Sequence, residues 1–432
     1  MSTPHIVILG GGFGGLYCAK ALRDAPVDIT LVDRKNHHLF QPLLYQVATA
    51  ALDASDIASP LRQIFADQQN VRVILGEVVT VDMARKRVVL EDAELAYDGL
   101  VIATGVTHTY FGHPEYAKLA PGLKTLDDAL EIRRRVFSAF EEAERTADPA
   151  EQARLLTFVL VGGGPTGVEL AGALAEIARE TLPGEFRNID PTRARILLVE
   201  AHTSVLQSYP ETLRDSAAAQ LRGLGVELWL GGRVTDVTER GVTIDGTLVP
   251  SATVLWAAGV AGSPVATSLG VPLDRSGRVV VEVDLSVPGH SNVYVVGDLA
   301  AMMSDGHPVP GVAQGAIQGG QLAAENLLRV LNGERTVPFH YRDRGSLATI
   351  GRARAVADLG RIKLGGPLAW LIWAGIHVLF LIGFRNRVSV ALSWSWAWLT
   401  RGRQARLITG RPPQLLGAAR QILAAPELPK SS

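Results

Sequence analysis

Residues 5–22 read HIVILGGGFGGLYCAKAL, a short apolar run followed by glycines in G-x-G-x-x-G spacing and then by a helix-like stretch. In such a loop the first glycine, here Gly10, forms a tight turn, and the second, Gly12, lets the backbone approach a pyrophosphate. The third, Gly15, allows the helix to pack closely on the strand. Phosphate groups then bind to the exposed N–H groups of the helix N-terminus. The stretch therefore predicts a strand, a loop and a helix that together bind a dinucleotide.

A second stretch of the same kind lies at residues 155–178, LLTFVLVGGGPTGVELAGALAEIA, with three glycines in the same frame. These glycines are Gly162, Gly164 and Gly167. Each copy is followed by an acid at the end of an apolar strand, Asp33 in DITLVD and Glu200 in ILLVE. A carboxylate at that place accepts the ribose hydroxyls of a dinucleotide. One glycine-rich turn is often only structural, but two copies with their acids predict two bound dinucleotides.

The order of elements predicts an α/β protein with two Rossmann-like dinucleotide-binding domains, one inserted into the other. A chain of 432 residues is long enough for two or three domains. An amphipathic helical stretch, TLDDALEIRRRVFSAFEEAER, precedes the second loop, and a longer one begins near residue 313. The expected boundaries are 1–118 and 263–340 for the first domain, 119–262 for the second, and 341–432 for a C-terminal region.

Charge and cysteine content limit the classes of partner and the cellular compartment. The chain has 42 basic and 43 acidic residues, which argues against a nucleic-acid partner, but residues 341–432 hold 14 Lys and Arg against 3 Asp and Glu. The single cysteine, Cys18, is interpreted as a core residue of the first helix, and no apolar signal segment opens the chain. Both features predict a reducing, cytoplasmic setting. No side-chain spacing matches a metal site, so no metal is expected, and His37 and His38 are interpreted as solvated or locally bonded.

An apolar segment in the C-terminal region predicts attachment to a membrane. Residues 365–384 read GGPLAWLIWAGIHVLFLIGF, contain no Asp, Glu, Lys or Arg, and border on the length of a bilayer span. Five of the seven tryptophans lie between residues 365 and 406 among several arginines, as is typical of the membrane interface. A single span would carry those arginines across the bilayer. We therefore favour a monotopic or re-entrant anchor over about residues 365–406, ahead of a true span and of a buried helix or homodimer interface.

Four stretches of the chain resemble the type II NADH dehydrogenases, which are single-subunit NADH:quinone oxidoreductases of the pyridine nucleotide-disulfide oxidoreductase superfamily. They are NHHLFQPLLYQVATA after the first acid, VGGGPTGVELAG in the second loop, the AQxAxQ pattern at residues 313–318 and GSLATIGRARAV from residue 345. The likeness covers almost the whole chain. It implies tightly bound FAD, one per chain, in the first domain, NADH as substrate in the second, and a membrane quinone, ubiquinone or menaquinone, as acceptor.

The resemblance also implies roles for individual residues. Those implied to hold FAD are Gly10, Gly12, Phe13, Gly14, Gly15, Asp33, Ala103, Thr104, Gly105 and Asp298. Those implied to line the NADH site are Gly162, Gly164, Gly167, Glu200 and Gly259, with Glu169 beside the nicotinamide. Asp298 has an alternative interpretation as the N-cap of a following helix. Glu169 also has an alternative interpretation, as an acid in the first turn of a helix that is stabilised by the helix dipole.

The chemistry of three of these side chains predicts specificity and an acceptor contact. A carboxylate at Glu200 accepts two ribose hydroxyls but repels a 2′-phosphate, which predicts NADH rather than NADPH as the donor. Gln314 and Gln318 are four residues apart, so they share one face of a helix and both reach one ligand. An amide offers a quinone carbonyl hydrogen bonds without titrating. The alternative is that both amides cap local backbone or face water.

The predicted activity is that of a respiratory NADH:quinone oxidoreductase that pumps no protons, in which a hydride passes to flavin N5 and two electrons then reach the quinone. Glu169, Gln314 and Gln318 are the residues expected at the reaction centre. The predicted location is the cytoplasmic face of a bacterial plasma membrane. A sulfide:quinone oxidoreductase would need redox cysteines that this chain lacks. The open alternatives are a soluble-type FAD-dependent NAD(P)H reductase of another acceptor and a membrane flavoprotein that senses nucleotides without turnover.

Overall fold

The computed structural model describes residues 3–400, 402–403 and 405–410, and its contacts divide the chain into two compact units. Unit 1 comprises Met1–Phe40, Ala58–Thr109 and Gly259–Arg344, and unit 2 comprises Gln41–Ile57, Tyr110–Ala258 and Gly345–Ser432. Each unit is built around its own mainly parallel sheet. Residues 401, 404 and 411–432 of the expected C-terminal region lie outside the described residues.

The central sheet of unit 1 has six strands in the order β20-β21-β9-β1-β2-β5. Neighbouring strands are parallel except β20 and β21, and Ile8 lies opposite both Leu31 and Val101. Residues 6–9 of β1 are completely buried, as expected of a strand that is covered on both faces. The strands are β1 (His5–Leu9), β2 (Asp28–Asp33), β5 (Val71–Leu75), β9 (Gly99–Ile102), β20 (Ser286–Val287) and β21 (His290–Val295).

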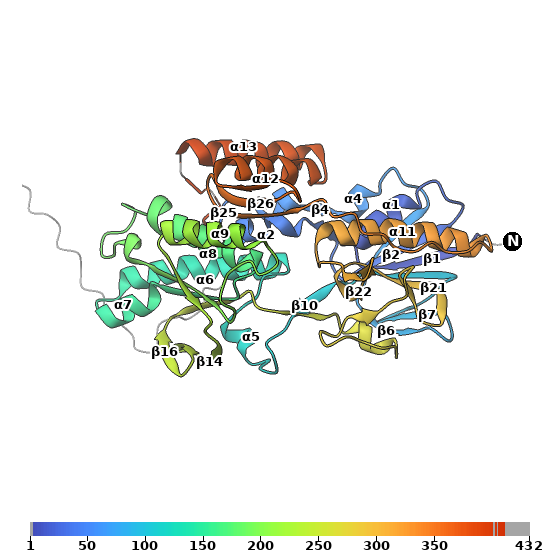
Figure 1. Cartoon of the computed structure of the whole chain (residues 1–432), viewed down its shortest axis with the longest axis horizontal. Coiled ribbons are helices and arrows are strands. Elements are labelled where there is room, and N and C mark those ends of the chain that lie inside the picture. The colour runs from blue at the N-terminus through green and yellow to red at the C-terminus, as the bar shows by residue number, and fades with distance from the viewer. Residues whose placement is uncertain (1–2, 401, 404, 411–432) are drawn as a thin grey trace, which may run out of the picture. The chain divides into compact units, whose positions relative to one another are not determined.

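Two helices of unit 1, α1 (Phe13–Ala21) and α11 (Ala313–Leu331), pack against each other, as Figure 1 shows. Their approach requires glycine, because a Cβ at Gly320 would collide with the Gly14 carbonyl and one at Gly14 would lie 3.0 Å from Val296. Cys18 of α1 is buried, and this burial raises the pKa of its thiol to about 12. The long helix near residue 313 and the core position of Cys18 are both confirmed.

Shorter elements complete unit 1. A three-stranded antiparallel meander consists of β6 (Val78–Asp82), β7 (Arg87–Leu90) and β8 (Glu94–Ala96). Four strand pairs are β3 (His37–Leu39) with β4 (Ala58–Pro60), β10 (Val106–His108) with β18 (Val260–Gly262), β19 (Val279–Val280) with β22 (Ala300–Ala301), and β23 (Met303–Ser304) with β24 (His307–Pro308). Two short helices are α4 (Leu61–Ile64) and α10 (Val265–Ser268).

Unit 2 has the same arrangement with fewer strands. Its parallel sheet has the order β13-β12-β11-β17, with Val159 opposite both Leu197 and Val254. In both units an antiparallel meander lies in sequence between the third and fourth parallel strands. The predicted α/β class with two Rossmann-like units is therefore confirmed. The strands are β11 (Thr157–Val161), β12 (Arg195–Glu200), β13 (Val226–Leu230), β14 (Val234–Thr238), β15 (Gly241–Ile244), β16 (Thr247–Pro250) and β17 (Thr253–Trp256).

The longest helix of unit 2, α6 (Leu126–Arg145), confirms the amphipathic helix predicted before the second loop. It begins at a capping box, in which the Thr125 side chain accepts from the Asp128 N–H and the Asp128 carboxylate accepts from the Thr125 N–H. The other helices of this unit before the C-terminal region are α2 (Leu44–Ala48), α3 (Ala54–Ile57), α5 (Tyr116–Leu119), α7 (Pro149–Leu155), α8 (Pro165–Glu176) and α9 (Glu211–Gly223).

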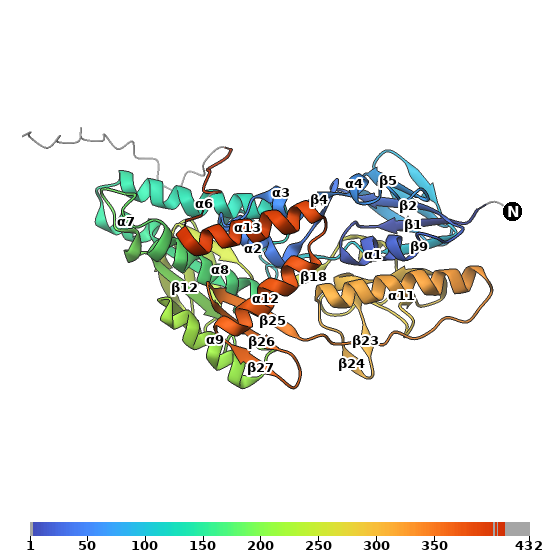
Figure 2. The ribbon, with the colours of Figure 1, turned by 90° about the horizontal axis from the view of Figure 1, so that it is seen from above.

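The C-terminal region adds a small sheet and two helices to unit 2. The antiparallel sheet contains β25 (Ser346–Gly351), β26 (Arg354–Asp358) and β27 (Lys363–Gly365), and it is followed by α12 (Pro367–Phe380) and α13 (Phe384–Thr400). The two helices contact each other and are joined by a turn at Gly383, where φ is 89°, and Figure 2 shows them diverging from this turn. The apolar segment 365–384 thus consists mainly of α12 and ends at this turn. Among the residues that the structure describes, no helix is both long enough and apolar enough to cross a membrane.

Candidate active site

The first glycine loop has the geometry that its sequence predicts. Gly10 has a φ of 99°, a left-handed conformation that side chains disfavour, and its N–H donates to the Val32 carbonyl at 2.8 Å. A Cβ at Gly15 would collide with the Gly10 carbonyl, so the third glycine sets the distance between helix and loop. A Cβ at Gly12 would meet nothing within 4 Å. The space beside Gly12, at the N-terminus of α1, is therefore open to a ligand.

Asp33 is fixed against this loop by its two oxygens. The Gly11 N–H donates to Oδ2 at 2.5 Å and the Lys35 N–H donates to Oδ1 at 2.7 Å. Burial raises the pKa of the carboxyl and the two backbone N–H groups oppose that shift, with a raised pKa as the result. The acid predicted to hold the ribose thus stands at the mouth of the loop.

His38 supports the same loop from a buried position. Only 1% of its surface is exposed, and its Nδ1 lies 2.9 Å from the Gly11 carbonyl oxygen, to which it donates. Its ring contacts the edge of Phe13, with 5.0 Å between ring centroids. Burial lowers the pKa of His38 to about 4, so the ring is neutral at physiological pH. The interpretation of His38 as locally bonded is confirmed, and solvation is excluded for this residue.

The other residues expected in the first site gather around the carboxyl ends of the parallel strands of unit 1. The Ala103 N–H donates to the Leu9 carbonyl at 2.7 Å, and the Thr104 hydroxyl lies 2.6 Å from that of Ser263. Asp298 follows β21 in a single 3-10 turn and the chain then enters β22, so it caps no helix. The remaining members, Phe13, Gly14 and Gly105, lie at the start of α1 and just after β9.

The second loop reproduces the first in detail. Gly162 has a φ of 108°, and its N–H donates to the Val199 carbonyl at 2.8 Å. A Cβ at Gly167 would collide with the Gly162 carbonyl, whereas one at Gly164 would meet nothing within 4 Å. The corresponding three glycines thus have the same three roles in both units.

Glu200 takes the place in the second loop that Asp33 has in the first. The Gly163 N–H donates to Oε2 at 2.6 Å, and Oε1 accepts from the backbone N–H and from Nδ1 of His202 at 2.9 and 2.6 Å. Burial raises the pKa of the carboxyl, but the hydrogen bonds from His202 and Gly163 outweigh it and hold the pKa below its usual value. Glu200 is therefore anionic at neutral pH.

Gly259, Gln318 and Glu169 have surroundings that their sequence positions did not indicate. Gly259, with a φ of 72°, groups with unit 1 rather than with the second loop. Gln314 and Gln318 share one face of α11, but the Gln318 amide is bonded at both ends to the backbone of Arg342, at 2.9 Å to the N–H and 3.0 Å to the carbonyl. Glu169 lies in the second turn of α8 rather than the first, so the first-turn interpretation was wrong.

A cavity of about 110 Å³ opens in unit 2 beside Glu169. Its walls include residues of α2, α8, β25 and the turn after it, α12, α13 and the segment after α13. Residues that line it and bear on its chemistry are Tyr45, Gln46, Glu169, Glu176, Thr349, Arg352, Trp373, Trp394 and Arg403. Most of these were outside the set expected from the sequence, although the quoted stretches NHHLFQPLLYQVATA and GSLATIGRARAV contain four of them.

One side of this cavity is formed by the rings of two tryptophans, one of which carries an N–H without a hydrogen-bond acceptor among the described residues. Trp373 and Trp394 stack with 5.3 Å between centroids. The Trp394 Nε1–H donates to the Gln46 Oε1 at 2.7 Å, and the Gln46 Nε2 donates to the Tyr45 hydroxyl at 2.8 Å. Trp373 is 1% exposed, and no described residue accepts a hydrogen bond from its Nε1–H. A ligand that is flat and carries a hydrogen-bond acceptor fits these walls.

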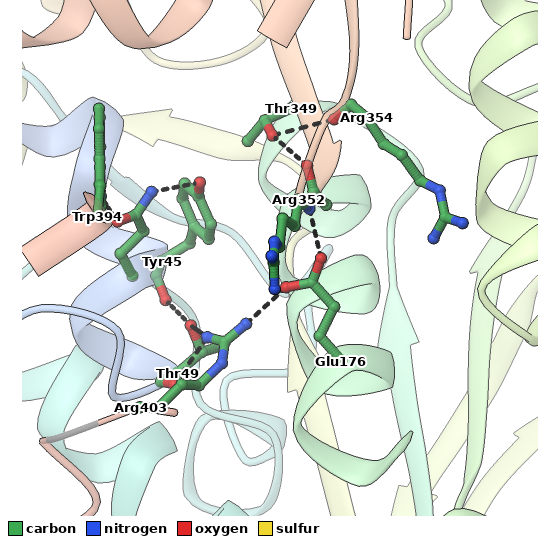
Figure 3. Close-up of polar contacts among 10 residues, drawn as sticks. Tyr45, Thr49, Glu176, Thr349, Arg352, Arg354, Trp394 and Arg403 are labelled. Carbon is green, nitrogen blue, oxygen red and sulfur yellow. Dashed lines mark hydrogen bonds and ion pairs between the residues drawn. The ribbon is translucent and has the colours of Figure 1, made fainter. Parts of the chain in front are cut away.

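Two carboxyls form the polar side. Glu169 accepts a hydrogen bond from the Thr349 N–H, and burial raises its pKa well above the usual range. Glu176, two turns further along α8, accepts from the Arg352 N–H and pairs with Arg403 at 2.8 Å. Burial raises the pKa of Glu176 and Arg403 opposes the shift. Figure 3 shows the Glu176 contacts together with those of Tyr45, Thr49 and Trp394.

Helices α12 and α13 carry a set of exposed apolar side chains, which we call the apolar face. Its members are Leu368, Leu371, Leu379, Phe384, Val388, Leu392, Trp396, Trp398 and Leu399. Phe384 is 82% exposed and Leu379 68% exposed. Monomeric proteins seldom expose so many large apolar residues on neighbouring helices without a partner surface.

These features define a class of protein. Residues 4–320 match the family model of the pyridine nucleotide-disulphide oxidoreductases, and residues 344–404 match that of the NDH2 C-terminal domain. The first match covers well over half of the chain, which therefore belongs to the pyridine nucleotide-disulphide oxidoreductases.

Known proteins narrow the family further. The chain is 48% identical to the type II NADH:quinone oxidoreductase Ndh of Mycobacterium tuberculosis, over 94% of this chain and 90% of that protein. It is 31% identical to the demethylphylloquinone reductase NdbB of Synechocystis, over 91% and 96%. The NDH2 structure from Plasmodium falciparum in complex with NADH has the same fold, with a TM-score of 0.86 over 95% and 100% of the chains at 20% identity. The chain belongs to the type II NADH:quinone oxidoreductase family.

Proposed function

We propose that this protein oxidises NADH with the help of bound FAD and reduces a membrane quinone. The observation that carries the proposal is the duplicated loop, in which Gly12 and Gly164 face open space and Asp33 and Glu200 each accept a loop N–H. One dinucleotide binds to each unit. Membership of the type II NADH:quinone oxidoreductase family supports the identity of both substrates.

FAD belongs in unit 1. The open backbone at Gly12, the N-terminus of α1 and the carboxylate of Asp33 fit a pyrophosphate and an adenosine ribose. His38 keeps the loop in place by its bond to Gly11, and Asp298 stands after β21 for the ribityl chain. Bound FAD supplies a two-electron carrier that accepts a hydride from NADH and passes the electrons to the acceptor.

NADH belongs in unit 2. Gly164 and the N-terminus of α8 take the pyrophosphate, and the anionic Glu200 takes the ribose hydroxyls. A 2′-phosphate at this place would face the charge of Glu200, so the site selects NADH over NADPH. We keep Gly259 as a residue near the nicotinamide end, because it follows β17 of the same sheet in sequence.

The cavity of unit 2 is the acceptor site. A quinone ring is flat, apolar and uncharged, which fits Trp373 and Trp394, and its carbonyl oxygens accept hydrogen bonds such as that of the unsatisfied Trp373 Nε1–H. Reduction to the quinol adds two electrons and two protons: the hydride of NADH accounts for both electrons and one proton, and solution supplies the second proton. Glu169 lines the cavity and burial raises its pKa well above the usual range, so we assign the transfer of the second proton to this side chain.

Neither amide of α11 is among the residues that line this cavity, and Gln314 as an acceptor contact stays a prediction. Gln318 uses both its donor and its acceptor on the Arg342 backbone, so we assign it to holding the residue 342 segment. This assignment corresponds to the alternative that the sequence left open for these amides.

The apolar face of α12 and α13 lies on the cytoplasmic leaflet of the membrane. Tryptophans and large aliphatic residues are exposed on it, and Arg385 and Arg387 lie in the first turn of α13, as suits the interface. A monotopic anchor of this kind brings the acceptor cavity, whose walls include both helices, close to the phase where quinones dissolve. A homodimer that covers the same face is the competing arrangement.

An anaerobic stopped-flow experiment tests the proposal on detergent-purified protein. Flavin absorbance is followed after addition of NADH and then of a short-chain quinone. Rapid bleaching and rapid quinone-driven recovery are expected. Bleaching without recovery would contradict the acceptor and leave a reductase of another acceptor. No bleaching despite bound NADH would identify a nucleotide-sensing flavoprotein.

A further inference from the structure

Arg403 connects two walls of the acceptor cavity that are far apart in sequence. Its Nη1 donates to the carbonyl and to the hydroxyl of Thr49, both at 3.0 Å, and its Nη2 pairs with the Glu176 Oε2 at 2.8 Å. The Arg403 and Glu176 side chains are only 10% and 14% exposed. Figure 3 shows the guanidinium between the end of α2 and the side of α8. Such a bridge needs the planar, multiply donating group of arginine.

On the α2 side, the bridge reaches the residues that face the cavity. The Thr49 hydroxyl donates to the Tyr45 carbonyl at 2.8 Å, one turn back along α2. At the other end of the same turn, Gln46 accepts from Trp394 of α13 and donates to the Tyr45 hydroxyl. Trp394 of α13 and Arg403 of the segment after α13 thus both bond to the chain around α2, at Gln46 and at Thr49. These two contacts fix α13 and the following segment to the same wall of the cavity.

On the α8 side, the bridge completes the bonding of a buried carboxylate. Glu176 Oε1 accepts from the Arg352 N–H in the turn after β25, and Oε2 accepts from Arg403. Among the described residues, Arg403 is the cation that pairs with Glu176. Removing it would leave a largely buried acid without its counter-charge, which is costly. We expect α8 and the turn after β25 to shift in response, and with them Thr349 and Glu169.

We propose that Arg403 is a positioning residue for the acceptor, which holds the α2 and α8 walls in the arrangement that binds the quinone ring. The inference rests on the proposed function, since it names the residue that shapes the same cavity. It also places quinone affinity under the control of the segment after α13. Gly402 and Arg403 of this segment line the cavity.

Arg406 offers a matched control on the same segment. Its guanidinium pairs with the more exposed Glu185 at 2.6 Å and donates to the Arg403 carbonyl at 2.8 Å. It does not line the cavity. Arg406→Ala therefore loosens the segment while it leaves the bridge between Thr49 and Glu176 in place.

The experiment compares Arg403→Ala, Arg403→Lys and Arg406→Ala as flavin-loaded full-length proteins. The first readout is the KM for a short-chain quinone beside the single-turnover rate of flavin reduction by NADH. The second is quinone binding without turnover, followed by quenching of tryptophan fluorescence, because tryptophans line the cavity. We expect Arg403→Ala to raise the quinone KM and Kd about tenfold, as for a largely buried pair that has lost one partner, and to leave the NADH half-reaction within twofold. Arg403→Lys should restore part of the affinity, and Arg406→Ala should stay within about twofold of the unaltered protein.

Glu176→Gln tests whether Arg403→Ala acts only by leaving the Glu176 carboxylate unpaired and so destabilising the fold. It removes the carboxylate charge but keeps the size of the side chain, and the Arg403→Ala/Glu176→Gln double variant should raise the quinone KM no more than Arg403→Ala does. Quinone KM and Kd that are unchanged in Arg403→Ala, or equally raised in Arg406→Ala, would overturn the inference. A slower NADH half-reaction in step with the KM would also overturn it, since it would indicate general damage. Failure of the proposed function is separate, because then the unaltered protein itself would not be reoxidised by quinone.

Discussion

Gly172 of α8 faces the backbone carbonyl of Ile350 in β25 so closely that a Cβ at this glycine would collide with the carbonyl oxygen. This contact joins the helix that follows the second loop to the sheet of the C-terminal region. It also sets the spacing of Thr349 and Glu169, which are neighbours of the two contacting residues on the cavity wall. The φ of Gly172 is not in the left-handed region, so backbone conformation does not require glycine here. The close approach of the Ile350 carbonyl does.

A methyl group at this contact should destabilise unit 2. We expect Gly172→Ala to lower the free energy of unfolding by about 1–3 kcal/mol, the usual cost of overpacking, despite the better helix propensity of alanine. Gly375 of α12 is the control, because it is also inside a helix and a Cβ there meets nothing within 4 Å. Urea denaturation of both variants is the measurement, and equal midpoints for Gly172→Ala and Gly375→Ala would contradict the role of the contact.

The second and third glycines of the NADH loop should separate binding from folding. Gly164→Ala adds a methyl group where the protein has none within 4 Å, so we expect an unchanged Tm and an NADH KM raised about tenfold. Gly167→Ala forces a methyl group against the Gly162 carbonyl and should lower the Tm as well. Thermal unfolding and NADH titration check the pair. A Gly164→Ala protein with normal NADH affinity would show that no pyrophosphate approaches this backbone.

Repetition explains why so much of the fold was predictable. Gly10 and Gly162, and Asp33 and Glu200, obtain their positions from a strand, a turn and a helix that are contiguous or nearly so in sequence. Such local units follow from apolar periodicity and the steric demands of glycine. The capping box at Thr125 and Asp128 is local in the same way.

The acceptor cavity could not be predicted in this way, because its walls are assembled from segments that are distant in sequence. Arg403 and Thr49 are separated by 354 positions and still share two hydrogen bonds. Helical spacing correctly put Gln314 and Gln318 on one face of a helix. It could not indicate that the Gln318 amide forms both of its hydrogen bonds with the backbone of Arg342. Tertiary contacts of this kind leave no periodic signal along the chain.

Nucleotide selectivity should depend on the charge of Glu200. In Glu200→Gln a 2′-phosphate no longer faces an anion, so we expect the preference for NADH over NADPH to fall at least about tenfold, equivalent to about 1.4 kcal/mol. The rate of flavin reduction by each nucleotide, at equal flavin content, is the measurement. Asp33→Asn is the control at the corresponding position of the other loop: it should lower flavin content and leave the preference unchanged. Unaltered selectivity in Glu200→Gln would remove the role of this carboxylate.

Glu169 should make unit 2 less stable as the pH rises. Its pKa in the folded protein is raised well above the ordinary value of 4.5, so the folded state retains a proton that the unfolded chain has released. The free energy of unfolding therefore falls as the pH increases from about 4.5 towards the raised pKa. Glu169→Gln cannot titrate and should flatten this dependence in urea denaturation between about pH 5 and pH 8. Glu141→Gln, at an exposed position of α6, should keep the original slope, and a Glu169→Gln slope equal to it would contradict the shift.

Membrane attachment should depend on the apolar face rather than on exposed apolar residues in general. Leu379 and Phe384 are 68% and 82% exposed, and burial of such a side chain in an apolar phase is worth about 1.5–3 kcal/mol. The double variant Leu379→Glu/Phe384→Glu should therefore bind phospholipid vesicles at least about tenfold more weakly and retain turnover with a short-chain, water-soluble quinone. Val283→Glu is the control, since Val283 is 74% exposed in unit 1. Sedimentation with vesicles measures the binding, and size-exclusion chromatography distinguishes it from self-association. If the double variant sediments like the unaltered protein but elutes as a smaller species, the apolar face is a dimer interface and the anchor lies elsewhere.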